Sequence, residues 1–116
     1  AVSAYTRYDK DTGRILCTIS GDKDYLVDTD NLIEGEYHGN QYYIDLQTMT
    51  AKLREDYTLD ALPVPCEVII EGDSYYCEEQ PEFDFDAPGA YKIWVYPDDP
   101  KYLERDFEYE NNPPQP

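Results

Sequence analysis

Short runs of alternating apolar and polar residues mark the second half of the chain, and turn residues such as Gly72, Pro88 and Gly89 separate them. Alternation with a period of two is typical of strands that bury one face. Short strands at roughly ten-residue spacing favour a small β-sandwich over residues 57–110. The runs expected to form strands are residues 66–71, 74–77, 82–86 and 91–96, with a last strand around residues 106–110.

The first half of the chain shows two hairpin patterns over residues 1–56. Residues 4–19 hold two β-rich runs around a turn-rich loop, and residues 41–54 hold a second pair of runs. Residues 25–33 fit either a strand pair or a loop, and no segment keeps a helical period. We therefore expect a mainly β protein with an N-terminal β-hairpin unit, followed by the sandwich and by a flexible Pro-rich tail at residues 111–116.

Alternation also predicts which side chains form the core of the second half. If Gly72 and Asp73 make a two-residue turn, Cys66 and Cys77 lie diagonally on one face, about 7–8 Å apart. That separation is too large for an unstrained disulfide, and the cysteine count of three is odd, so free thiols are expected. The residues expected to form the core are Cys66, Val68, Ile70, Phe83, Phe85, Tyr91, Ile93 and Val95.

The opposite face of the same strands carries surplus aromatic area. In the assumed register Ile69 faces Tyr76, while Trp94 and Tyr96 project to the same side of their own strand. Monomeric domains rarely leave such a patch in water, so either the first-half hairpins cover it or it binds another protein. Aromatic side chains are favoured at the centres of interfaces. Ile69, Tyr76, Trp94 and Tyr96 are therefore the candidate partner-binding residues.

Charge narrows the range of partners. The chain has 26 acidic and nine basic residues, and its net charge is −17. Phosphate contacts need Lys and Arg, so direct binding of nucleic acid is not expected, and an anionic membrane surface would repel the chain. No run approaches the about 20 apolar residues that a membrane-spanning helix needs. A basic protein partner would be attracted.

Candidate residues for catalysis or metal binding are few. His38 lies in a turn-rich stretch without the partnered nucleophile and orienting acid of a catalytic triad. The cysteines lack the paired spacing of zinc ligands, and Asp28 and Asp30 do not continue into a calcium-loop pattern. No phosphate-binding or dinucleotide glycine motif occurs. We expect no enzyme activity, no cofactor, no metal and no small-molecule substrate.

Several stretches, taken in order, resemble small virion proteins of tailed bacteriophages. Tyr8 and Asp9 followed by residues 12–16 (TGRIL) resemble the opening of many such proteins, and residues 43–45 (YID) resemble their next strand. The second half is similar to their small immunoglobulin-like module. The residues that carry this similarity are Pro65, Cys66, Glu67, Val68, Ile70, Glu71, Gly72, Tyr75, Phe85, Pro88, Gly89, Tyr91, Tyr102, Leu103 and Phe107.

The resemblance implies a non-enzymatic structural protein of a bacteriophage particle with an immunoglobulin-like β-sandwich. It would dock onto the tail or fibre-attachment region of the virion, after assembly in the bacterial host cytoplasm. Its partners would be other virion structural proteins, in multiple copies. Two alternatives stay open: a capsid decoration protein, and an acidic DNA mimic that inhibits a host nucleic-acid-binding protein. A mimic needs carboxylates in a duplex-like line, whereas a docking protein needs an apolar contact patch.

Overall fold

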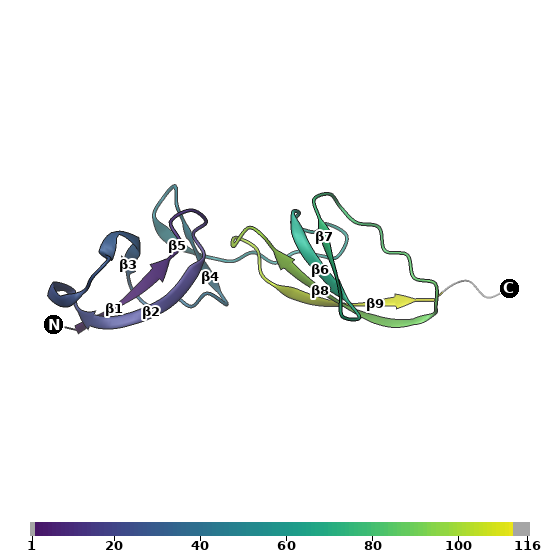
Figure 1. Ribbon diagram of the computed structural model, residues 1–116, viewed down its shortest axis with the longest axis horizontal. Coiled ribbons are helices and arrows are strands. Elements are labelled where there is room, and N and C mark those ends of the chain that lie inside the picture. The colour runs from purple at the N-terminus through teal and green to yellow at the C-terminus, as the bar shows by residue number, and fades with distance from the viewer. Residues whose placement is uncertain (1, 113–116) are drawn as a thin grey trace. The chain divides into compact units, whose positions relative to one another are not determined.

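The chain forms two compact units, Ala1–Glu55 and Asp56–Pro116, and the computed structural model describes residues 2–112 of them (Figure 1). Every regular element among these residues is a β-strand or a single-turn 3₁₀ helix. The expected mainly β class is therefore confirmed. The division between the units lies one residue before the expected end of the N-terminal unit at residue 56.

The first unit holds a three-stranded sheet in the order β2-β1-β3 and a separate two-stranded sheet of β4 and β5. Both expected hairpins are present, β1 with β2 and β4 with β5, and both are antiparallel. Residues 25–33 hold the end of one 3₁₀ turn, all of a second, and the start of β3. The elements are β1 Val2–Tyr8, β2 Ile15–Asp22, η1 Lys23–Tyr25, η2 Thr29–Asn31, β3 Leu32–Glu34, β4 Tyr42–Asp45 and β5 Thr50–Leu53.

The loop between β1 and β2 shows why position 13 is a glycine. The Asp9 carboxylate accepts hydrogen bonds from the Asp11 and Thr12 amides at 2.8 and 3.2 Å, which closes the turn. Gly13 then adopts φ 82°, and its carbonyl accepts a 2.8 Å bond from the Ile44 amide. A Cβ at Gly13 would lie 2.1 Å from the Ile44 carbonyl oxygen. Only glycine permits this approach of the two backbones.

The second unit is built on one four-stranded sheet in the order β7-β6-β8-β9. All three strand pairs are antiparallel, and β8 lies between β6 and β9 (Figure 1). Asn111 is the last residue of β9, so the expected tail starts inside a strand, and residues 113–116 lie outside the described part of the chain. The strands are β6 Cys66–Ile70, β7 Asp73–Cys77, β8 Gly89–Pro97 and β9 Arg105–Asn111.

The turn between β6 and β7 differs from the expected one. Its central residues are Glu71 and Gly72, with φ of 51° and 84°. Positive φ at both positions is favoured in a two-residue hairpin turn, because it matches the twist of the strands. This turn places Cys66 directly opposite Cys77, so the expected diagonal arrangement is wrong. All three cysteines are nevertheless free thiols, as expected.

The core of the second unit lies on one face of its sheet. Cys66, Val68, Ile93 and Val95 are buried there with Leu62, which confirms the strand faces expected for these four sheet residues. The opposite layer consists of irregular segments, whose packed side chains include Tyr57, Leu59, Val64, Phe83 and Phe85.

The expected strand at residues 82–86 is wrong, because this stretch joins no sheet and runs as an irregular segment between β7 and β8 (Figure 1). Its aromatic side chains still pack inward: the Phe85 ring stacks on Tyr91 with centroids 4.0 Å apart. The Asn111 amide group donates to the carbonyls of Phe85 and Ala87 at 2.9 and 2.8 Å. The unit therefore has two packed layers, but the immunoglobulin-like arrangement of two sheets is not confirmed.

Candidate protein-binding site

The face of the second unit's sheet that points away from the core is called the outer face here. Because side chains alternate along a strand, the residues between the core positions project to this side. The register of the four strands then decides which of them are neighbours across the sheet. The outer face is formed by Glu67, Ile69, Ser74, Tyr76, Lys92, Trp94, Tyr96, Asp106 and Glu108.

All four residues that the sequence singled out for partner binding lie on the outer face. Trp94 is 40%, Tyr96 38% and Tyr76 59% exposed, while Ile69 is half-buried. Trp94 lies directly opposite Ile69 across the β6–β8 pair. The expected pairing of Ile69 with Tyr76 is wrong, because the Glu71–Gly72 turn shifts the register and places Ser74 opposite Ile69.

Tyr76 and Tyr96 are not direct neighbours across the sheet, because Glu67 lies between them. Glu67 is opposite Tyr76 on β7 and opposite Tyr96 on β8. The Glu67 carboxylate accepts a 2.6 Å hydrogen bond from the Ser74 hydroxyl. The three rows Lys92–Glu108, Ile69–Trp94 and Glu67–Tyr96 thus give the outer face an aromatic centre with carboxylates around it.

The Tyr76 hydroxyl is held by an acid from another segment. It donates a hydrogen bond to the Asp98 carboxylate, in the loop that follows β8. This hydrogen bond, with desolvation and the negative charge of Asp98, raises the pKa of Tyr76 to about 12. The bond orients the ring, although the side chain is largely in solvent.

Lys92 modifies the environment of Trp94. Its ammonium group lies 5.3 Å from the centre of the Trp94 ring and 3.5 Å from the Asp106 carboxylate. A cation over an aromatic face is attracted by the ring quadrupole, so Lys92 steadies the indole without covering it. Sequence reasoning did not include Glu67, Lys92 or Asp98 in the site. Strand alternation could have placed the first two there, but the position of Asp98 follows only from the tertiary structure.

Other candidate chemistry in the described residues is sparse. No group of three or more His, Cys, Asp or Glu side chains that could hold a metal ion occurs within residues 2–112. His38 Nε2 lies 3.5 Å from the Glu36 carboxylate, and both side chains are exposed. Cys17 and His38 line the same shallow hollow of about 340 Å³ in the first unit, a proximity that the sequence did not indicate.

No helix in the described part of the chain is long and apolar enough to cross a membrane. Comparisons with protein-family models, with curated proteins and with solved structures found no match. Inference about function is therefore based on the geometry of the outer face. It is a surface with three exposed aromatic rings, one aliphatic side chain and a surrounding set of carboxylates, which suits contact with another protein.

Proposed function

We propose that this chain is a non-enzymatic structural protein that docks onto another protein through the outer face of its second unit. The observation that carries the proposal is the separation of the two faces of one sheet. Val68, Ile93 and Val95 are at most 1% exposed on the core face, so the core is complete without Trp94 and Tyr96. Aromatic residues that the core does not use are the kind of side chain that dominates binding energy at interfaces.

The partner surface should carry basic residues around an apolar hollow. Glu67, Asp98 and Asp106 surround the aromatic rings, and the whole chain carries a charge of −17. Opposite charges on a partner would accelerate association and fix its orientation. An assembly with several copies of this chain also needs basic neighbours or bridging cations, because the copies repel one another.

The setting that we propose is a bacteriophage particle, in its tail or fibre-attachment region. The support for this setting is the ordered similarity of residues 8–16, 43–45 and 65–107 to small tailed-phage virion proteins. A docking protein with an exposed aromatic face fits such a role, since virion components assemble by contact between many protein surfaces.

The substitution Trp94→Ala tests the docking surface. Trp94 is 40% exposed, so we expect the isolated variant to stay folded, with a loss of at most about 1 kcal/mol in unfolding free energy. Truncation at the centre of an interface removes about 2 kcal/mol or more of binding energy. The variant should therefore be at least about tenfold depleted from purified particles, measured by quantitative mass spectrometry against the wild-type chain.

Tyr25→Ala is a matched control, because Tyr25 is an aromatic residue of the first unit and is 84% exposed. This variant should be incorporated as well as the wild type. If folded Trp94→Ala is also incorporated at wild-type occupancy, the outer face is not the docking surface. If neither the wild type nor the variants sediment with particles, the virion setting is wrong.

The alternative function, a DNA mimic, would require a line of carboxylates on the same sheet. Asp106, Glu108 and Glu110 occupy alternate positions of β9, which is a line of carboxylates about 7 Å apart. Lys92 lies 3.5 Å from Asp106 within this line, and the aromatic rings lie beside it, so the surface favours protein docking over mimicry. Displacement of duplex DNA from a host DNA-binding protein by this chain would reverse that preference.

A further inference from the structure

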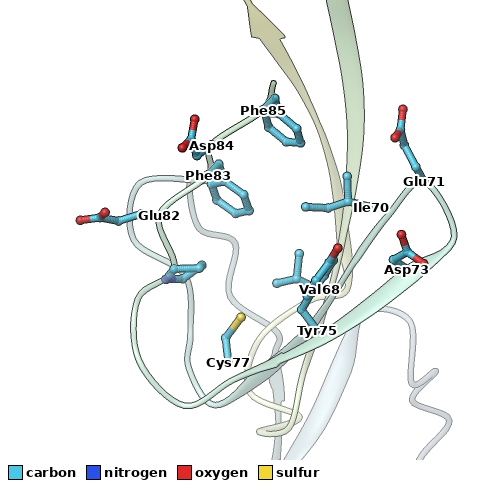
Figure 2. A pocket seen from close by; sticks show the side chains of 11 residues that line it. Val68, Ile70, Glu71, Asp73, Tyr75, Cys77, Glu82, Phe83, Asp84 and Phe85 are labelled. Carbon is cyan, nitrogen blue, oxygen red and sulfur yellow. The ribbon is translucent and has the colours of Figure 1, made fainter. Parts of the chain in front are cut away.

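A groove lies on the core side of the second unit, between the β6–β7 hairpin and the segment that follows β7. Its volume is about 540 Å³, within the range of sites that hold a few side chains. Val68 and Ile70 lie on one side of it, and Phe83 and Phe85 point toward them from the other (Figure 2). Tyr75 forms part of its wall and remains 53% exposed. Val68 itself is buried, so the apolar surface that the groove offers comes from the partly exposed side chains of Ile70, Phe83 and Phe85.

The rim of this groove is acidic on both sides. Glu71 and Asp73 come from the hairpin, and Glu82 and Asp84 come from the facing segment, where their carboxylates point away from the apolar side chains (Figure 2). All four residues are exposed. An occupant that fills the apolar floor would lie between two segments that each carry two exposed acidic residues. Charge complementarity therefore selects an occupant with basic residues on either side of an apolar centre.

The groove lies beside an open strand edge. β7 is the outermost strand of the sheet, and its pairing with β6 runs without a bulge from Asp73 to Cys77. The two-residue turn makes Ile70 and Asp73 a hydrogen-bonded pair, so alternate residues of β7 turn their backbone groups toward β6. Ser74 and Tyr76 consequently turn their N–H and C=O groups away from the sheet. Proteins usually protect such edges with charged side chains, Pro or bulges; β7 has no Pro and no bulge, and its single charged residue, Asp73, stands at its start.

We propose that an extended segment of a partner protein adds to β7 as a fifth, antiparallel strand and inserts alternate side chains into the groove. The strand edge and the groove favour the same occupant, because a strand paired with Ser74 and Tyr76 places every second side chain on the core side of the sheet. The inserted side chains are apolar near the middle of the partner segment and basic near its two ends. The groove lies on the other side of the sheet from the outer face, and the added strand would use only the backbone of the outer-face residues Ser74 and Tyr76.

The probe is the peptide acetyl-Lys-Thr-Val-Thr-Val-Thr-Lys-amide with a fluorescent label, in which Lys and Val share one side of an extended chain. Binding is measured by fluorescence anisotropy at about 0.15 M salt, where distant charges are screened. The control peptide has N-methyl groups on its three Thr residues, which face the outward groups of β7. It keeps the charge and side chains but removes the donors. We expect the control to bind at least tenfold more weakly.

Ser74→Pro tests the same strand edge from the side of the protein. Proline removes the outward N–H of Ser74 and is tolerated on edge strands, so binding should weaken at least tenfold while Trp94 emission stays native. The double variant Asp73→Asn and Glu82→Gln tests the rim and preserves its shape; we expect about fivefold weaker binding. Tyr25→Ala, in the first unit, should bind the peptide like the wild type.

Three results would overturn the proposal. The first is no binding of the parent peptide up to about 1 mM. The second is equal binding of the parent and N-methylated peptides, or unchanged binding in folded Ser74→Pro, because charge alone would then explain the interaction. The third is a dimer of the chain itself, seen by sedimentation and abolished by Ser74→Pro, which would assign the edge to a second copy.

Discussion

Thr6 of β1 ties two distant backbone groups together inside the first unit. Its side chain is fully buried. The hydroxyl donates to the Gly35 carbonyl at 2.8 Å and accepts from the Tyr37 amide at 2.9 Å. Both partners lie beyond the end of β3, so one polar atom fixes the path of that segment against β1. Sequence alternation could place Thr6 on a face, but it could not identify either partner.

Replacing Thr6 by Val should destabilise the first unit by about 1–3 kcal/mol. The shape of the side chain is kept, but the Gly35 carbonyl and the Tyr37 amide lose their partner in a partly buried position. Amide hydrogen exchange of the first unit measures the loss. Thr18→Val is the matched control, because Thr18 lies opposite Thr6 in the strand pair and is only partly buried; its effect should stay within about 0.5 kcal/mol. Equal losses in both variants would contradict the assigned role.

Cys66 is the most buried thiol of the chain. It is 0% exposed, and desolvation, with lesser effects of Cys77 and Asp98, raises its pKa from 9.0 to about 11. Between these two values the folded chain keeps the proton, whereas the unfolded chain loses it. The unfolded state therefore binds fewer protons in this window, and stability falls as the pH rises.

We expect the urea midpoint of the second unit to decrease between about pH 9 and 11. Emission of Trp94, the single tryptophan, reports this unfolding. Cys66→Ala should be less stable at pH 8 but lose less stability on further alkalinisation, because one titrating group is gone. Cys17→Ala, at an exposed position in the first unit, should keep the wild-type slope. A wild-type slope in Cys66→Ala would show that the thiol does not contribute.

At the scale of elements, the β6–β7 hairpin shows which features of the fold can be predicted from local sequence and which cannot. The two strands and their faces follow from alternation of residues 66–70 and 73–77. The register does not, because both Glu71–Gly72 and Gly72–Asp73 are acceptable as a two-residue turn by composition. The paired strand β8 decides between them, since it binds the other side of β6 and fixes the positions that the turn must join.

Glu71→Asn should stabilise the second unit by about 0.5–1 kcal/mol. Glu71 adopts φ 51°, a left-handed conformation that Asn tolerates better than Glu, and Asn-Gly is the preferred pair for this turn. The increase is measured as a higher urea midpoint by Trp94 emission. Gly72→Ala is the opposite control: at φ 84° an alanine is strained, so it should destabilise. A loss of stability in Glu71→Asn would mean that the Glu71 side chain makes a contribution beyond the turn.

For the whole molecule, we expect the repulsion that comes with a net charge of −17 to exceed the stabilisation from individual ion pairs. Lys10 with Asp30, Lys52 with Asp45, and Arg105 with Asp56 form such pairs, and the hydrogen bonds that each Asp accepts, with the neighbouring cation, lower its pKa. Exposed pairs each contribute little. The 26 acidic residues far outnumber the nine basic ones, and mutual repulsion of the carboxylates favours the unfolded chain.

Raising the salt concentration from about 0.01 M to about 0.15 M should therefore stabilise the protein, because screening weakens repulsion more than it weakens the few ion pairs. We expect an increase of about 1 kcal/mol, or about 4–8 °C in Tm, in calorimetric scans. Replacing the exposed loop residues Glu78 and Glu79 by Lys should make the response smaller. A Tm that falls with added salt would show that the ion pairs dominate instead.

The sequence by itself determined the strand faces, the mainly β class and the acidic character, because side-chain alternation and composition are local properties of the chain. It placed Val68, Ile93 and Val95 inside and Trp94 outside, and the structure agrees. The tertiary structure decided the rest: the register that pairs Ile69 with Trp94, the contact of Tyr76 with Asp98, and the irregular path of residues 82–86, which leaves a groove. These features depend on which distant segments compete for the same backbone hydrogen bonds, and alternation along one segment carries no information about that competition.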